Sequence, residues 1–225
     1  MNIGLCQVEF AYGDEDFRLH IPELKLATGS RTAFVGPSGS GKTTLLHLLA
    51  GITQPQSGTI QVGENPLHSL SDAGRRAFRI KQIGFVFQDF RLIEYLNVLE
   101  NIRIPYRLND AINLTAEVNI RLDSLAKDLQ LTDKLDAAID TLSQGELQRV
   151  AIGRALLPQP KLILADEPTG NLDPSSKSKI LDLLFAQANA NHATLVMVTH
   201  DHALLDRFEQ VINFEEFHKR ETPYA

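Results

Sequence analysis

Four short apolar runs along the chain each end in polar or glycine residues. The runs cover residues 32–35, 83–87, 162–165 and 194–198, and they are rich in Val, Ile, Leu and Phe. Short continuous runs of this kind, separated by helical stretches, are typical of parallel strands that are buried on both faces. Ligands of such sheets bind beyond the carboxyl ends of the strands. The pattern therefore predicts an α/β fold in which the four strand ends meet at one site.

The first residues of the chain follow a different pattern. Residues 3–12 and 17–26 alternate roughly between apolar and polar side chains on either side of a turn at Gly13 and Asp14, as antiparallel strands do. We therefore expect a small antiparallel β-layer beside the main sheet.

The stretch from residue 89 to about residue 141 has a helical pattern and no strand signal. The apolar residues with amphipathic spacing in it are Ile120, Leu125, Leu129 and Leu131. A helix is also predicted over residues 144–157, which Pro158 and Pro160 stop, and another over residues 175–189, which follows Asp173 and Pro174.

The length of 225 residues suits one domain with one well-buried core. We predict a single domain over residues 1–225, in which the helical stretch is an inserted subdomain. Its parts are the β-layer and first half of the core (1–88), the helical subdomain (89–146) and the second half of the core (147–225).

A phosphate-binding loop follows the first predicted core strand. The sequence GPSGSGKTT matches the pattern G-x-x-x-x-G-K-[ST] and precedes an apolar helix, as that motif requires. Its glycines let backbone N–H groups point at an anion, Lys42 can reach the β- and γ-phosphates, and the Thr43 hydroxyl is placed to ligate Mg²⁺. The residues expected to bind nucleotide here are Gly36, Ser38, Gly39, Ser40, Gly41, Lys42, Thr43 and Thr44.

Two acidic residues end the third core strand. Asp166 suits the Mg²⁺ side of the site, and Glu167 can orient or deprotonate the attacking water. A capped strand end with solvated charges is the alternative, but a phosphate loop needs an acidic partner on a neighbouring strand. Guanine specificity is not expected, because residues 133–136 (DKLD) lack the first residue of an Asn-Lys-x-Asp element.

A further motif precedes this strand by about twenty residues. Residues 142–150 (LSQGELQRV) resemble the Leu-Ser-Gly-Gly-Gln stretch, and the Gln-Arg-Val after it, of the ATP-binding subunits of ABC transporters. The resemblance covers nearly the whole chain and implies that Ser143 and Gly145 meet a γ-phosphate. Gln144 and Glu146 depart from the commonest residues of the family, and Glu146 is carried over as a nucleotide contact. Ser-x-Gly at a helix start is also a common N-cap.

The resemblance implies roles for other residues. Gln88 matches the glutamine that senses metal and water, and His200 matches the switch histidine near the γ-phosphate. Tyr12 aligns with the aromatic that stacks on adenine, and residues 171–173, which include Asp173, match the loop that meets the opposite subunit. His202 lies two residues after His200, but no third ligand at a suitable spacing supports a metal site on this pair.

The mechanism that the resemblance implies uses two copies of the chain. Two ATP molecules lie between the phosphate loop of one subunit and Ser143 of the other, so that closure depends on ATP. Water activated at Glu167 hydrolyses ATP while Lys42, Mg²⁺ and His200 offset the charge of the γ-phosphate, and the dimer then opens. The expected catalytic residues are Glu167, His200, Lys42 and Gln88, and the expected metal residues are Thr43, Gln88 and Asp166.

Composition limits the partners of such an ATPase. Lys and Arg number 22 against 28 Asp and Glu, and the net charge of −6 without a basic tail argues against nucleic acid. No apolar run approaches the length of about 18 residues that a membrane helix needs, so we expect the ATPase to act on another chain. The single Cys6 excludes an intrachain disulfide, and a start without a leader pattern favours the cytoplasm.

The helical insert is rich in apolar side chains. They are Phe90, Leu92, Tyr95, Leu96, Ile104 and Tyr106. We expect about half of them to pack within the insert and the rest to form a groove for the coupling helix of a membrane permease.

Residues 87–90, 97–101 and 167–173 most resemble lipoprotein-releasing, macrolide-exporter and cell-division ATPases, which work with separate permeases. The chain ends soon after residue 214, with no room for a C-terminal regulatory domain, which favours export or mechanotransmission at the cytoplasmic face of the inner membrane. The alternative is a soluble ABC-type ATPase that acts on a non-membrane assembly partner. It fits less well, because the 101 positions between Lys42 and Ser143 leave no room for a long coiled coil.

Overall fold

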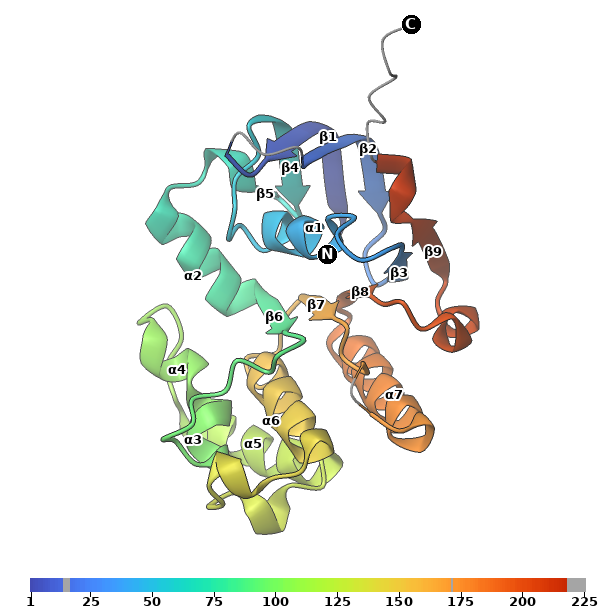
Figure 1. Ribbon diagram of the computed structural model, residues 1–225. Coiled ribbons are helices and arrows are strands. Elements are labelled where there is room, and N and C mark those ends of the chain that lie inside the picture. Colours follow the sequence, from blue (N-terminus) through green and yellow to red (C-terminus); the bar gives the residue numbers. More distant parts are fainter. Residues whose placement is uncertain (14–16, 171, 218–225) are drawn as a thin grey trace, which may run out of the picture.

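A five-stranded parallel sheet forms the centre of the fold (Figure 1). The computed structural model describes residues 1–13, 17–170 and 172–217. The strands of this sheet are β3 (Arg31–Val35), β6 (Ile83–Val86), β7 (Leu162–Asp166), β8 (Thr194–Val198) and β9 (Gln210–Asn213), in the order β6-β7-β8-β3-β9. The four predicted core strands are confirmed. Strand β9 was not predicted, because its side chains are mostly exposed and lack an apolar run.

Both faces of the parallel sheet are buried. Along β7, Leu162 and Leu164 join the apolar cluster on one face, and Ile163 and Ala165 join the cluster on the other. This arrangement explains why the strand is a continuous apolar run rather than an alternating one.

A second sheet is antiparallel and includes the start of the chain. Its strands are β1 (Ile3–Ala11), β2 (Arg18–Leu26), β4 (Ser57–Val62) and β5 (Asn65–Pro66), in the order β2-β1-β4-β5. The predicted antiparallel pair of β1 and β2 is confirmed. Of its predicted turn, Gly13 belongs to the described part of the chain, whereas Asp14 lies outside the described residues.

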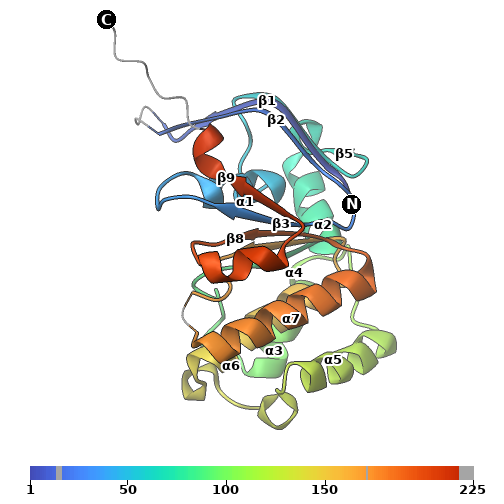
Figure 2. The same ribbon diagram turned by 90° about the vertical axis from the view of Figure 1, so that its right-hand side faces the viewer.

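Helix α1 (Lys42–Leu49) lies between the two sheets (Figure 2). Four of its residues, Leu45, Leu46, Leu48 and Leu49, are fully buried. A helix with apolar residues on several sides is stable only where it is covered on those sides. This packing fixes the start of α1 at the carboxyl end of β3.

The remaining helices lie beside or beneath the parallel sheet (Figures 1 and 2). They are α2 (Asp72–Gln82), α3 (Val98–Arg103), α4 (Pro105–Leu108), α5 (Ala116–Asp128), α6 (Gln144–Leu156) and α7 (Pro174–Asn191). Short 3-10 helices cover Leu67–Ser69, Thr132–Lys134, Ile139–Thr141, His202–Arg207 and Phe214–Phe217. None of the helices within the described residues combines the length and apolar character that a membrane crossing requires. The division into subdomains stays a prediction, and its boundary after residue 146 falls within α6.

The predicted buried face of the insert is wrong at one position. Leu125, Leu129 and Leu131 are buried as expected, but Ile120 is 70% exposed. At 100° per residue Ile120 lies about 200° around α5 from the buried Val118, so the two cannot share one face.

Candidate functional site

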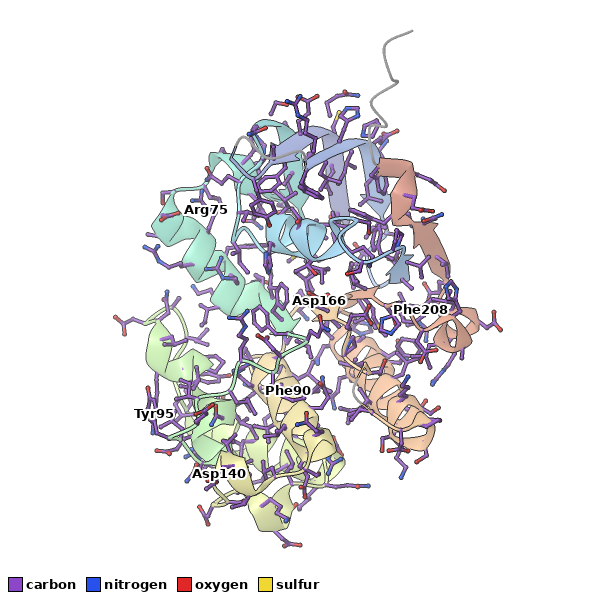
Figure 3. The ribbon with its side chains drawn as sticks, viewed as in Figure 1. Arg75, Phe90, Tyr95, Asp140, Asp166 and Phe208 are labelled. Carbon is purple, nitrogen blue, oxygen red and sulfur yellow. The ribbon has the colours of Figure 1, made fainter. Side chains whose placement is uncertain are left out.

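A cavity of about 550 Å³ lies at the carboxyl ends of the parallel strands. Its lining residues are Tyr12, Phe17, Gly36, Ser38, Gly39, Gly41, Lys42, Thr43, Thr44, Gln88, Asp166, Glu167, Val198 and His200. The segments after β3, β6, β7 and β8 all contribute, so the four predicted strand ends do meet at one site. Figure 3 shows Asp166 at the middle of the molecule, where the parts meet. The volume is within the range of about 300–1,000 Å³ for small-molecule sites.

The loop between β3 and α1 has the backbone of an anion-binding nest. Gly39 and Gly41 have φ angles of 78° and 92°, in the left-handed region. A Cβ atom on Gly41 would lie 2.6 Å from a ring carbon of Phe17, so glycine is needed there for both reasons. Gly41 is also the N-cap of α1 and makes no side-chain cap, which leaves the first N–H groups of the helix for an anion.

Lys42 lies beneath this loop. Its ammonium donates hydrogen bonds to the carbonyl oxygens of Gly36 at 2.9 Å and Pro37 at 2.8 Å, and to the Ser40 hydroxyl at 3.3 Å. Burial lowers the pKa of Lys42, and the nearby carboxylates of Glu167 and Asp166 oppose that shift. Its hydrogen-bond partners are neutral oxygens, so a phosphate would supply stronger, charge-assisted bonds.

Asp166 supplies a buried carboxylate at the end of β7. Burial raises its pKa, and a hydrogen bond from the Thr43 side chain partly opposes this. A hydroxyl and a carboxylate thus lie side by side beneath the phosphate loop. Oxygen ligands of this kind suit Mg²⁺, which binds through one or two protein groups together with substrate phosphates.

Glu167 and His200 form a pair across the ends of β7 and β8. The Nδ1 atom of His200 lies 2.8 Å from Oε1 of Glu167, and the backbone N–H of His200 donates to Oε2 at 3.4 Å. The Glu167 side chain is 11% exposed and the His200 side chain 69%. The carboxylate is therefore held within the cavity, and the imidazole lies at its mouth.

The predicted adenine contact lies at the edge of the same cavity. The Tyr12 hydroxyl is 3.2 Å from the Thr44 hydroxyl, and its ring centroid is 5.9 Å from that of Phe17. Phe17 was not among the predicted site residues. Its signal was its place at the start of the second antiparallel strand, because continuing the pairing of Ala11 with Arg18 brings Phe17 next to Tyr12.

Five of the predicted nucleotide contacts do not line this cavity. One is Ser40, which is buried within the phosphate loop, and the others are Ser143, Gly145, Glu146 and Asp173. Ser143 is the N-cap of α6, where its backbone N–H donates to Oε2 of Glu146 at 2.8 Å and its Oγ accepts from the Glu146 N–H at 3.4 Å, forming a capping box. The Ser143 hydroxyl also donates to Oε2 of Glu146 at 2.8 Å. These hydrogen bonds lower the pKa of Glu146.

Gly145 lines a separate cavity of about 130 Å³ together with Leu172 and Ser176. Asp173 is the N-cap of α7 and accepts hydrogen bonds from the backbone N–H groups of Ser175 and Ser176. Asn171 of the predicted opposite-subunit loop lies outside the described residues. The start of α6 and the loop before α7 thus come together, away from the cavity around Lys42.

A groove of about 340 Å³ lies between α2, β6, α4 and α6. Of the six apolar insert residues considered above, only Ile104 lines it. Leu92 and Tyr106 pack against the helical core, and Tyr95 is 88% exposed at the outer edge of the helical part (Figure 3). The insert thus contributes to the groove, but mainly through Ile93, Pro105 and Leu108 beside Ile104 rather than through the other residues named. Because β6 is the edge strand, Phe85 and Phe87 supply much of the groove wall.

Residues 19–170 match the model of the family described as ABC transporter. The chain belongs to the ABC transporter family. It is 43% identical over 190 residues to the ABC transporter ATP-binding protein YbbA of Escherichia coli (strain K12). This match covers 84% of the present chain and 82% of YbbA. It is also 40% identical over 194 residues to the lipoprotein-releasing system ATP-binding protein LolD of Legionella pneumophila (strain Lens). That match covers 86% of the present chain and 85% of LolD.

Solved structures of ABC cassettes share the fold. The ATP-binding cassette MJ0796, as a dimer in a post-hydrolysis state bound to ADP and Pi, has a TM-score of 0.83 and 31% sequence identity. The match covers 94% of this chain and 93% of that one. These findings confirm the predicted fold class of an α/β ABC core with an antiparallel layer and a helical part. This ABC chain is accordingly an ATP-binding subunit with ATPase activity.

Proposed function

We propose that the ABC ATPase works as a pair of identical subunits that bind two ATP molecules with Mg²⁺ between them and drive a separate membrane permease. The observation that carries this proposal is the separation of two half-sites. Lys42, Asp166 and Glu167 line one cavity, whereas Ser143 and Gly145 lie elsewhere. A second copy can bring its own Ser143 to the Lys42 cavity, and a two-fold axis then completes both sites. The dimeric state of the MJ0796 cassette supports this arrangement.

Within one half-site the phosphate loop and Lys42 hold the β- and γ-phosphates of ATP. Tyr12 and Phe17 lie beside the adenine ring. Thr43 and Asp166 offer a hydroxyl and a buried carboxylate to Mg²⁺, with Gln88 at the edge of the cavity. Their fit is supported by the raised pKa of Asp166, since a bound cation offsets the cost of burying its charge. When bound there, Mg²⁺ would offset the negative charge of the phosphates.

Glu167 is the proposed base for hydrolysis. Its carboxylate orients a water molecule and accepts its proton as the oxygen attacks the γ-phosphorus, and the bond from that phosphorus to the oxygen of the leaving ADP breaks. The hydrogen bonds from His200 hold the carboxylate in place. The exposed imidazole is free to face the γ-phosphate at the mouth of the cavity.

The opposite subunit supplies the other contacts to each ATP. The proposed groups are the Ser143 hydroxyl, the Gly145 N–H group and the Glu146 side chain at the start of α6, with Asp173 at the subunit interface. Ser143 already donates to Glu146 within the chain, so its hydroxyl must turn from this carboxylate to a phosphate when the dimer closes.

The groove beside β6 is the proposed site for the permease. Its apolar walls suit a short helical segment of another chain, and it adjoins Phe87, the residue before Gln88. LolD, which belongs to a lipoprotein-releasing system, supports a role in export or mechanotransmission. The subunit would then work at the cytoplasmic face of the inner membrane.

Gel filtration of the wild-type protein and of Glu167→Gln, with and without Mg-ATP, tests this function. We expect Glu167→Gln to lower the ATPase rate by at least about 100-fold and to form a dimer only with ATP, because the bridging γ-phosphate persists. Glu117→Gln, on the exposed side of α5, is the control for the loss of one charge. Normal hydrolysis by Glu167→Gln, with no dimer in either protein, would contradict both the base and the paired sites.

A further inference from the structure

The groove between α2, β6, α4 and α6 has an unusual charge for an acidic chain. Its lining consists of apolar side chains and three arginines, Arg79, Arg91 and Arg154, and it contains no Asp or Glu. The whole chain carries a net charge of −6. The groove is therefore a local positive site with apolar walls.

Two of these arginines have no carboxylate partner among the described residues. Arg79 donates to the carbonyl oxygens of Ala50 at 3.1 Å and Gly51 at 3.2 Å. Arg154 donates to the carbonyl oxygens of Phe90 and Arg91. Neither belongs to any ion pair of the described residues. Burial lowers the pKa of both, that of Arg154 to about 10, and a guanidinium group keeps its positive charge in proteins.

Other positive charges reinforce this site. Arg75 and Arg76 are close enough on α2 to lower the pKa of Arg79 further by repulsion. Arg75 and Arg76 both form ion pairs with Asp72, whereas Asp72 acts on Arg79 only through its charge, which partly opposes the lowering of the Arg79 pKa. A partly buried cation of this kind gains most from a carboxylate that arrives with its own apolar surroundings.

We propose that the groove binds a permease segment that presents an Asp or Glu side chain to Arg79 from among apolar side chains. This inference rests on the proposed function and names the chemistry of its partner. The apolar part of that segment covers Ile52 and Leu108, of which Leu108 is 68% exposed at the rim. An anionic lipid surface fits less well, because it would bind the exposed Arg76 at least as readily as Arg79 inside the groove.

The groove also offers a path from the partner to the nucleotide cavity. Arg154 and Arg91 line the groove, and Arg154 holds the backbone of Phe90 and Arg91. Gln88, two residues before Phe90, lines the nucleotide cavity. A segment that binds in the groove therefore lies against Arg91 and Arg154, next to the part of the chain that carries Gln88.

Photocrosslinking from the groove rim identifies the bound segment. The full-length chain with p-benzoylphenylalanine in place of Leu108 is produced in its own cells, irradiated, and the crosslinked peptide sequenced by mass spectrometry. We expect a cytoplasmic segment of a permease that carries an Asp or Glu within one or two helical turns of the crosslink. Arg79→Glu should lower the crosslinking yield at least about tenfold, whereas Arg76→Glu on the same helix should not. Changing the acidic residue of the captured segment to Arg should restore crosslinking to Arg79→Glu.

The outcomes separate this inference from the proposed function. A captured permease segment without an acidic residue, or equal yields for Arg79→Glu and Arg76→Glu, overturns the inference and leaves the permease partner intact. Failure to capture any permease overturns both. Equal loss of binding to vesicles of anionic phospholipid for the two variants, with no permease captured, assigns the charges to lipid instead. Arg91→Glu is the second variant if Arg79→Glu lowers the melting temperature, because the Arg91 side chain is exposed and pairs with Asp89.

Discussion

Three residues of the nucleotide cavity have a strained backbone or a buried charge, and each of these features lowers the free energy of unfolding. Glu167 has a φ angle of 45°, and a non-glycine residue in this region costs about 1–3 kcal/mol. Asp166 is a carboxylate buried against its solvation preference, and Lys42 is a buried cation bonded to neutral oxygens. Such costs persist where a bound ligand offsets them. We therefore expect the ATPase without nucleotide to be less stable than its fold allows.

Asp166→Asn tests this cost directly. The neutral amide removes a buried charge and can still accept the hydrogen bond from Thr43. We expect the free energy of unfolding, measured by urea denaturation at pH 7 without nucleotide or Mg²⁺, to rise by about 1 kcal/mol. Hydrolysis of Mg-ATP should be lost in the same variant. Asp140→Asn, at an exposed aspartate of the helical part, should change neither property, and a destabilised Asp166→Asn would contradict the argument.

At the scale of elements, the sequence predicts the strands and helices that are buried on all sides, because their residues form continuous apolar runs. Strands β3, β6, β7 and β8 were predicted because both of their faces are buried, and α1 because it is apolar along its length. Strand β9 pairs with β3 through mostly exposed residues, and β5 has two residues, so neither leaves a pattern. Ile120 was wrongly grouped with the buried leucines, because it lies on the opposite side of α5 from the buried Val118.

The candidate site follows the same rule. The phosphate loop and the acidic end of β7 were predicted because each is a continuous stretch of sequence that directly follows an apolar strand. Phe17 was missed because it enters the cavity through the pairing of β1 with β2, which is a tertiary relation. The groove walls at Phe85 and Arg79 were missed because they come from two elements that the sequence analysis did not combine.

The start of α6 should respond to pH through its capping box. Hydrogen bonds from Ser143 lower the pKa of Glu146, so the stability that this carboxylate contributes is present above its unfolded pKa near 4.5 and is lost as pH falls through the lowered folded value. We expect Glu146→Gln to lose less stability than wild type on acidification below about pH 4.5. Thermal unfolding between pH 3.5 and 7 measures this difference. Glu117→Gln, also in the first turn of a helix, is the control, and equal acid sensitivity of Glu146→Gln and wild type would contradict the prediction.

At the scale of the whole molecule, one side chain joins the two half-sites. Helix α6 begins at the Ser143 N-cap and carries Arg154 near its end, and the guanidinium of Arg154 holds the carbonyl oxygens of Phe90 and Arg91. Both of those residues have left-handed φ angles, 59° and 52°. Figure 3 shows Phe90 in the connection between the sheet and the helical part. The half-site on α6 and the cavity that contains Gln88 are thus linked within one chain.

Arg154→Met tests whether Arg154 affects catalysis through the Phe90 segment or only contributes to the stability of the fold. Methionine keeps much of the side-chain volume but removes the donors that hold the Phe90 and Arg91 backbone in place. We expect kcat for ATP to fall at least about tenfold, as the loss of one or two hydrogen bonds from a charged donor implies, whereas KM changes little because the Lys42 loop is untouched. Millimolar guanidinium should restore part of the rate.

Arg121→Met is the matched control for this experiment. Arg121 also donates to a backbone carbonyl, that of Leu157 at 2.8 Å, and its other side-chain hydrogen bonds within the described residues go to Gln159 and Tyr106 rather than to the segment after Gln88. We expect it to lower stability by a similar amount without changing kcat. If both variants lowered the melting temperature equally and neither changed kcat, Arg154 would be a packing residue alone. The two half-sites would then have to communicate through the opposite subunit, because α6 would have no other hydrogen-bonded hold on this segment among the described residues.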